Sequence, residues 1–333
     1  MLSHQLLEHI LLLCAGIAVI LLLGDVVIRN AVALAEHYHL SGSFIGLTVL
    51  SVGTSIPELM THLIASAHIL SDPSQMDTLS ALVIGSNIGS DIIQQDLLLP
   101  VIGLIGTVLV VRAEVHMQIG ALMAAALLLW VFALDGQISR AEGALLVIAY
   151  FGYLLYLMRE NHIIDRVVAQ RNNTTGRPIL KLVIILICFL IMAIAADRVV
   201  AAAVELVAVL PMSASLFGVL VLGVATALPE LITALLSMAK GHNSISAGIL
   251  IGSNVTNPLM GVGLGAVVSE YTVPNVVNVY DLPFKIFTAG LLYVFLLRHE
   301  DLNRREAATL ILLCLVYLFM RPIWFPGDAV IIG

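Results

Sequence analysis

The segment GLTVLSVGTSIPELMTHLIAS, at residues 46–66, recurs as GVLVLGVATALPELITALLSM at residues 218–238. The two copies align without gaps and are identical at 10 of 21 positions, which indicates that the chain contains two related halves. The tetrapeptide IGSN repeats as well, at residues 84–87 and 251–254. The fold is therefore expected to use one structural unit twice.

The composition places the chain in a lipid bilayer. Of its 333 residues, 60% are apolar and 11% are charged, whereas soluble domains average about 45 to 50% apolar and about 25% charged residues. Apolar stretches long enough to cross roughly 30 Å of hydrocarbon recur from end to end. We expect an all-α integral membrane protein whose ten transmembrane helices lie near residues 7–35, 43–70, 77–109, 114–134, 139–158, 179–209, 213–239, 243–270, 281–298 and 304–321.

A hydrophilic stretch with five basic residues, 159–181, divides the chain near its middle. It predicts a first five-helix repeat at 1–160, a connecting loop at 161–178 and a second five-helix repeat at 179–333. Since five is an odd number of crossings, the second repeat enters the membrane in the opposite orientation to the first. Such inverted-topology repeats are typical of secondary transporters, which bind their substrate near the bilayer midplane between the repeats.

The distribution of basic residues predicts the orientation. Ten Lys and Arg residues lie at helix ends on one side, and only Arg140, Lys285 and Arg321 lie on the other. Because positive residues favour the cytoplasmic side, we expect both termini outside and the 159–181 loop in the cytoplasm. The predicted location is the plasma membrane, the inner membrane of a bacterial cell, crossed many times.

Several classes of function find no support in the sequence. The acidic residues never form a run, so the formal charge of −7 indicates no particular partner and no nucleic acid. The three cysteines lie in apolar segments without CxxC spacing, which predicts neither a disulfide nor a zinc site. There is no HExxH motif and no nucleophile paired with a base, so an intramembrane enzyme is not indicated. We expect no resident cofactor and no obligate protein partner.

A proline followed by a glutamate interrupts each copy of the repeated segment, which places Glu58 and Glu230 at equivalent positions. A carboxylate at the centre of a membrane helix costs about 2.5 to 3.5 kcal/mol, and neither segment contains a Lys or Arg near its centre. A bound cation is one compensation; protonation and hydrogen bonding inside the bundle is the other. A neutral loaded site passes apolar helices at low cost, so we expect the first and sixth helices to slide over the others.

Oxygen donors surround the two glutamates in the sequence. Each proline removes a backbone donor, which is expected to leave carbonyls free beside the carboxylate. The GSN elements contribute Ser86 and Ser253, and Ser90 and Asn257 follow one helical turn later. Such hard oxygen ligands suit calcium and sodium, although small polar residues also serve in helix packing.

The paired motifs GTSIPEL with GSNIGSD, and ATALPEL with GSNVTNP, resemble the sodium/calcium exchanger branch of the cation/calcium exchanger superfamily. The resemblance covers essentially the whole chain and is to the prokaryotic type, without a large regulatory loop. It implies an antiporter that exchanges calcium for sodium by alternating access, with calcium bound by both glutamates. The cation ligands that it implies are Thr54, Ser55, Glu58, Ser86, Ser90, Thr226, Glu230, Ser253 and Asn257, with the backbone carbonyls of Ser51 and Gly223.

Three positions depart from the family pattern and leave the coupling ion open. Ala227 replaces a serine, Ser90 an asparagine that is common there, and Asn257 an aspartate that is common in sodium-coupled members. An asparagine has nearly the shape of a protonated aspartate, so this position is indifferent to pH. Exchange of calcium for protons is the alternative, and a passive cation channel is less favoured because channels do not require an inverted repeat.

Other polar residues near the glutamates have two interpretations each. His62 follows Glu58 by one turn, where it either relays a proton or is held by hydrogen bonds within the bundle. Asp91 lies one residue past the matched position; a local bulge would turn it into the site. Otherwise Asp91, Gln94 and Gln95 line a polar access path along the third helix.

Overall fold

The computed structural model describes residues 2–37, 50–105, 112–164, 178–210, 212–239, 243–299 and 302–325. Parts of three expected features lie outside these residues: 43–49 of the second helix, 106–109 of the third, and 165–177 of the connecting loop. The first half contains the helices α1 (Leu2–His37), α3 (Ser51–Thr54), α4 (Ile56–Ser71), α5 (Met76–Ile93), α6 (Leu99–Ile105), α7 (Arg112–Ala133) and α8 (Arg140–Ile164). The second half contains α9 (Pro178–Val209), α10 (Ala214–Phe217), α11 (Gly223–Thr226), α12 (Leu228–Ala239), α13 (Asn243–Thr256), α14 (Gly263–Ser269), α15 (Leu282–His299) and α16 (Arg304–Trp324).

Several of these helices are joined by single turns of wider helix, in which the backbone bonds span five residues. These π-helical turns are Gln94–Leu98, Gly218–Leu222, Asn257–Val262 and Val277–Asp281. A short 3₁₀ turn, Pro73–Gln75, precedes α5. Proline lies within or just after three of the π turns, as Pro100, Pro258 and Pro283, and its missing amide disrupts the regular ladder there. The turns therefore mark positions where polar side chains can be re-aimed.

The helix boundaries agree closely with the ranges expected from hydropathy. Among the described residues, eight helical runs are long and apolar enough to cross a membrane. The structure is thus mostly helical, and the count of ten spans stays a prediction. It also contains one element that was not expected: β1 (Gln137–Ile138) pairs antiparallel with β2 (Tyr271–Thr272), which ties the loop after α7 to the loop after α14.

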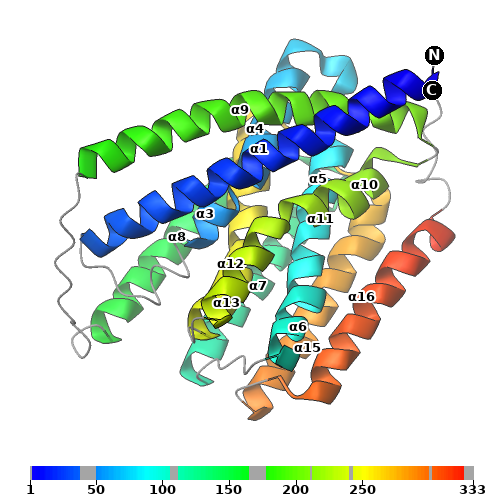
Figure 1. Cartoon of the computed structure of the whole chain (residues 1–333). Helices are drawn as coiled ribbons and strands as arrows, with labels where there is room; N and C mark the ends of the chain where they lie inside the picture. The colour runs from blue at the N-terminus through cyan, green and yellow to red at the C-terminus, as the bar shows by residue number, and fades with distance from the viewer. Residues whose placement is uncertain are drawn as a thin grey trace.

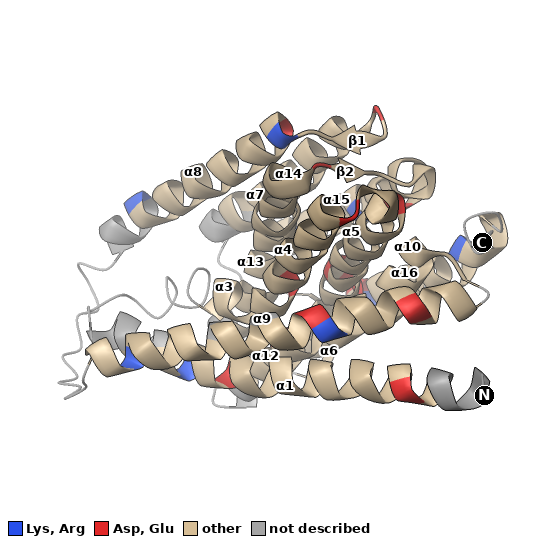
Figure 2. Ribbon diagram, turned by 90° about the horizontal axis from the view of Figure 1, so that it is seen from above, with Lys and Arg blue, Asp and Glu red and all other residues tan. Residues whose placement is uncertain are grey.

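Figure 1 shows α1 and α9 side by side, crossing the remaining helices obliquely on one side of the molecule. The same arrangement is visible from above in Figure 2, where charged residues are sparse along the ribbons. Both helices are apolar, and α9 exposes large side chains such as Ile179, Leu186 and Leu190 on its outer face. In a bilayer this face contacts lipid, while the opposite face of the pair covers the helix bundle.

Contacts between the halves are reciprocal. Helix α1 packs on α9 and α7 packs on α15; α8 packs on α14 and α6 on α16; α5 packs on α11 and α13 on α3. In chain order each of these contacts joins an element of one half to an element of the other. The two halves are therefore interleaved rather than set apart as separate bodies.

Two basic residues do not lie where the sequence analysis placed them. Lys285 and Arg321 were counted among the charges at helix ends on the outer side, but their side chains are 0% and 1% exposed. Arg321 binds Asp281 through two nitrogens, each at 2.9 Å, and Lys285 contacts Asp91. Hydropathy alone could not show this, because both residues fall within one turn of a predicted helix end. Of the three charges assigned to the outer side, only Arg140 is substantially exposed.

Glycines allow α5 to cross the second half at backbone contact. A Cβ atom added to Gly218 would lie 2.3 Å from the carbonyl oxygen of Leu82 and 2.7 Å from the amide nitrogen of Ser86. A Cβ atom on Gly85 would lie 2.4 Å from the carbonyl oxygen of Ser215. Close approach through small residues is a common way for membrane helices to associate. The crossing fixes Ser86 and its neighbours against the broken helix that carries Glu230.

We expect Gly218→Ala to destabilise the protein by about 1 to 3 kcal/mol, because the added methyl group forces two backbones apart. Gly152→Ala is the matched control, since no heavy atom lies within 4 Å of a Cβ at this helical position. Alanine favours a helix over glycine, so the control should keep or slightly raise the melting temperature. The melting temperatures of the purified variants in detergent test this; equal values for both would contradict the backbone crossing.

Candidate functional site

Two helix breaks position the glutamates. Helix α3 ends at Thr54 and α4 begins at Ile56, so Glu58 lies in the first turn of a new helix. The second half repeats this geometry: α11 ends at Thr226, α12 begins at Leu228, and Glu230 lies in its first turn. Unpaired amides and the helix dipole both favour a negative group at such an N-terminus. The prolines in these turns need no amide partner there, which explains the local sequence.

The two carboxylates are buried, with 2% and 0% of the residues exposed, and they share one polar cluster. Ser90 donates a hydrogen bond of 3.0 Å to Glu58 Oε1. Glu230 Oε1 accepts from Ser253 at 3.3 Å and from Ser55, across the halves, at 3.5 Å. The described residues supply no Lys or Arg partner to either glutamate. The site therefore joins both halves around two like charges that repel each other.

The two threonines at the breaks exchange partners between the halves. The Thr226 hydroxyl lies within hydrogen-bonding range of Glu58, and the Thr54 hydroxyl lies within range of Glu230. Thr54 also approaches Ser253, with 3.5 Å between the hydroxyl oxygens. Each carboxylate is thus flanked by a hydroxyl from its own half and one from the other half.

The carbonyls of Ser51 and Gly223 are not free, contrary to what the prolines suggested. Ser51 O accepts from the Ser55 amide at 3.1 Å, and Gly223 O accepts from the Ala227 amide at 3.1 Å. The amide that proline removes would have bonded four residues earlier, to the carbonyl of Gly53 or Ala225. A carbonyl oxygen has a second lone pair, so Ser51 and Gly223 remain possible ligands, but the break itself does not expose them.

Buried oxygens without a hydrogen-bond partner gather at this site. Within the part of the chain that the structure describes, Glu58 Oε2, Glu230 Oε2 and Asn257 Oδ1 accept no hydrogen bond. Buried polar atoms are nearly always paired, and an unpaired one costs about 1 to 3 kcal/mol, or more when it is charged. Two carboxylate oxygens and an amide oxygen together form a set that a hard cation would satisfy.

Asp91 meets Asn257 across the two halves. Asn257 Nδ2 donates to Asp91 Oδ1 at 2.9 Å, and the ammonium of Lys285 contacts Asp91 Oδ2. Asp91 also interacts electrostatically with Glu230. The structure thus brings Asp91 beside a predicted ligand, as one of its two interpretations required, and adds Lys285, which the sequence analysis did not assign to the site.

The expected access path along the third helix is filled by buried side chains. Gln94 donates to Ser90 at 2.9 Å and accepts from Asn254 at 3.5 Å. Gln95 donates to Thr288 of α15 at 2.7 Å, and neither glutamine is more than 1% exposed. In this conformation these residues buttress the site. Ser86 is also buried, and its backbone packs against the glycine crossing described above.

His62 is held by neutral partners. Its Nδ1 lies 3.1 Å from the Tyr271 hydroxyl and its Nε2 lies 3.4 Å from Asn87 Nδ2. Because the Asn87 amide can only donate, Nε2 accepts and Nδ1 carries the proton. The Tyr271 hydroxyl in turn donates to the carbonyl of His62 at 3.1 Å. This geometry agrees with the second interpretation of His62, a histidine bonded within the bundle.

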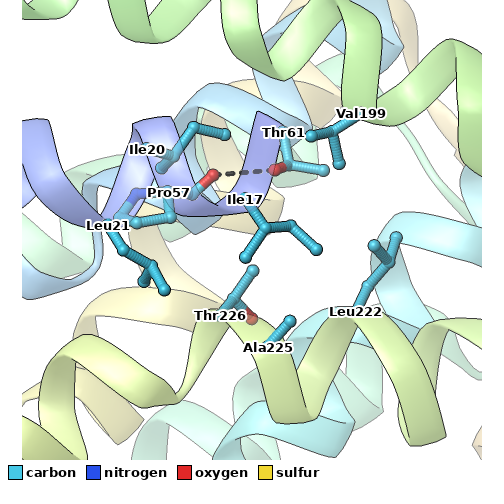
Figure 3. A pocket seen from close by; sticks show the side chains of 9 residues that line it. All are labelled: Ile17, Ile20, Leu21, Pro57, Thr61, Val199, Leu222, Ala225 and Thr226. Atoms are coloured by element: carbon cyan, nitrogen blue, oxygen red, sulfur yellow. Dashed lines mark hydrogen bonds between the residues drawn. The ribbon is translucent and has the colours of Figure 1, made fainter. Parts of the chain in front are cut away.

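A small apolar pocket separates the breaks from α1 and α9. Figure 3 shows Pro57 and Thr61 on one side and Ala225 and Thr226 on another, with the hydroxyl of Thr61 bonded to the Pro57 carbonyl at 2.7 Å. The remaining lining residues come from α1, α9 and the turn before α11, and they are Ile17, Ile20, Leu21, Val199 and Leu222. The two long helices therefore present an apolar surface to the broken segments.

The chain belongs to the sodium/calcium exchanger protein family, whose model matches residues 8–159 and 180–321. It is a multi-pass membrane protein of a family of cation-exchange transporters, and membrane transport of calcium and sodium by antiport is the activity of that family. Among the described residues no three His, Cys, Asp or Glu side chains are grouped to hold a metal. A cation site here thus depends on two carboxylates and neutral oxygens.

Known proteins resemble this one over most of its length. The inner membrane protein YrbG of Escherichia coli is 28% identical, over 78% of this chain and 79% of its own. The sodium/calcium exchanger MaX1 of Methanosarcina acetivorans is 25% identical, over 93% and 97% respectively. A structure of the sodium-calcium exchanger NCX_Mj, soaked with sodium and strontium, superposes with a TM-score of 0.65 at 21% identity and covers 95% of this chain and 98% of its own. This last likeness shows the fold.

Calcium is expected to stabilise the wild-type protein through the glutamates. A ligand at about 100 times its dissociation constant contributes about 2.7 kcal/mol to the folded state. Glu58→Gln and Glu230→Gln should each abolish this gain, yet unfold at the same or a higher temperature than wild type without calcium, because one of two repelling charges is removed.

Thermal unfolding in detergent, with calcium and with a chelator, measures both effects. The exposed Glu8, on α1, supplies the control: Glu8→Gln should respond to calcium as the wild type does. A full calcium response in either site variant would contradict the assignment of these carboxylates.

Proposed function

We propose that this protein is a secondary active antiporter that exchanges calcium for sodium, with the transported cation bound between Glu58 and Glu230. The observation that carries the proposal is the set of unpaired buried oxygens shared by the two halves. The proposed ligands are both glutamates, the hydroxyls of Thr54, Ser55, Ser86, Ser90, Thr226 and Ser253, the amide oxygen of Asn257, and the carbonyls of Ser51 and Gly223.

Inverted repeats explain the reciprocal contacts best. If α1 corresponds to α9, α3 to α11, α5 to α13, α6 to α14 and α8 to α16, each contact between halves has a counterpart with the halves exchanged. The aligned segments and the two stretches matched by the family model support the same division. We propose ten membrane spans in two repeats, 1–160 and 179–333, joined by a loop at 161–178.

The orientation follows from the basic residues. Because Lys285 and Arg321 are buried with carboxylates, they no longer count as charges on the outer side. The excess of basic residues at the opposite ends becomes larger, which favours a cytoplasmic 159–181 loop and outer termini. The membrane is proposed to be the plasma membrane of the cell.

Alternating access is proposed to use α1 and α9 as a sliding pair. These helices face the breaks through aliphatic side chains, so a site that carries net charge would pass them only at high cost. One calcium ion, or two monovalent ions, neutralises Glu58 and Glu230. An empty site retains its charge, and it is therefore expected not to cross, which couples the two fluxes.

Exchange of calcium for protons is the second candidate. It is favoured by Asn257, which has no acidic proton to exchange and leaves the two glutamates as the groups that bind either ion. The hydrogen bonds of His62 to neutral partners give this candidate no further support. A passive cation channel is less favoured, since it gives the interleaved halves no role.

Calcium uptake into liposomes that contain the purified protein decides between these functions. A sodium gradient should drive uptake in the wild type, whereas uptake driven only by a pH gradient would replace sodium with the proton as the coupling ion. Glu58→Gln and Glu230→Gln should each reduce uptake by about 100-fold or more, since a first-shell ligand is at least as important as the outer-shell groups whose loss costs about 10- to 100-fold.

Glu8→Gln serves as the control variant and should transport as the wild type does. Full transport by both site variants would reject the proposed site. Calcium flux that needs no gradient of a second ion would reject antiport in favour of a channel.

A further inference from the structure

A buried lysine lies beside the proposed cation site. Lys285 comes from α15 and Asp91 from α5, both side chains are 0% exposed, and they are in direct contact. The nearby carboxylate of Asp96 is already bonded, to Thr288 at 2.7 Å and to Gln95 at 3.1 Å. The ammonium of Lys285 is therefore directed to Asp91.

The pair changes the charge of the site. Glu58, Glu230 and Asp91 would together carry three negative charges, and Asp91 is close enough to Glu230 to interact with it. Lys285 cancels one of these charges with a cation that is covalently attached to the protein. Only the charges of the two glutamates then remain for transported ions to neutralise.

The pair also orients Asn257. A carboxylate accepts hydrogen bonds and does not donate them, so Asn257 must turn its NH2 group toward Asp91, as the distance of 2.9 Å shows. Its carbonyl oxygen, Oδ1, is left without a partner among the described residues. Asp91 thus fixes an uncharged oxygen donor, while its own charge is cancelled by Lys285.

We propose that Lys285 is a tethered cation that replaces one transported monovalent ion and sets the exchange ratio at two monovalent ions for one calcium. This inference rests on the proposed calcium antiport and is independent of whether sodium or the proton is the coupling ion. Its physical basis is the apolar surface of α1 and α9, past which only a neutral site moves cheaply.

A purely structural ion pair is the competing interpretation. Buried ion pairs contribute little net stability, and apolar replacements of both partners are often tolerated. Such a pair would affect folding when it is broken but would leave the exchange ratio unchanged. The ratio therefore separates the two interpretations, whereas stability and rate do not.

The test is the calcium gradient at which net flux stops in liposomes, with the membrane potential held at zero and a tenfold gradient of the ion that drives uptake. Since free energy is logarithmic in concentration, the wild type should balance a calcium gradient of about 100-fold. In Lys285→Met the unpaired Asp91 should take up a third monovalent ion, so the limit should rise to about 1,000-fold.

Two further variants control for damage to the site. Lys285→Arg keeps the positive charge and should keep the limit of about 100-fold, whatever its rate. The double variant Lys285→Met with Asp91→Asn removes both charges and should return to the same limit. Asp91→Asn alone leaves the ammonium free to compete for a glutamate, and it should weaken calcium affinity by about tenfold or more.

Specific outcomes would overturn the inference. A wild type that balances about 1,000-fold already exchanges three ions despite Lys285, and a Lys285→Met variant that stays at about 100-fold shows that Asp91 binds no ion when it is released. If Lys285→Met does not fold, the wild-type limit and an undiminished calcium affinity in Asp91→Asn decide instead. Absence of calcium flux under both sodium and pH gradients would reject the antiport function itself.

Discussion

Glu58 and Glu230 place two like charges in one buried site at the interface of the two halves, and much of the surrounding structure serves to make this arrangement possible. Each carboxylate lies in the first turn of a helix that begins after a break. Each is met by hydroxyls of its own half and of the other half. None of these donors is charged, so they hold the carboxylates in position without cancelling their charge. A cation is needed for that, and the need is what couples ion binding to movement.

The packing of the bundle follows from the same requirement. Ser90 and Asp91 reach the site because α5 crosses the broken helix of the second half at backbone contact, which glycine permits at Gly85 and Gly218. Polar side chains on the π-helical turns then fill the space toward α15. On the other side, α1 and α9 offer only aliphatic groups and one threonine-lined pocket. The site is thus polar toward the bundle and apolar toward the helices proposed to slide.

Much of this arrangement was predictable from local patterns. Hydropathy located the helix boundaries, and the aligned repeats identified Glu58 and Glu230 as a pair, because equivalent positions in two copies of one unit come together when the copies interleave. Seven of the proposed ligand side chains, those of Thr54, Ser55, Glu58, Ser90, Thr226, Glu230 and Ser253, gather around the two carboxylates. The relevant signals are local in sequence and are duplicated, which is why they could be read.

Features that depend on contacts between distant segments were not predictable. Lys285 lies 194 residues from Asp91, in a part of the sequence with no counterpart in the repeated motif, and its position near a helix end suggested an exposed charge. The partners of His62, Tyr271 and Asn87, are likewise set by the tertiary packing. The carbonyls of Ser51 and Gly223 show a different error: proline frees the carbonyl four residues before it, not the one that the resemblance suggested.

The most direct test is the position of a bound ion. A crystal structure of the protein grown with strontium, a heavier stand-in for calcium, would reveal the ion by its anomalous scattering. We predict one strong peak within about 2.3 to 2.6 Å of oxygens from both Glu58 and Glu230, at distances typical of calcium sites. A peak bound by one glutamate alone, or located away from both, would contradict a cation site shared between the two halves.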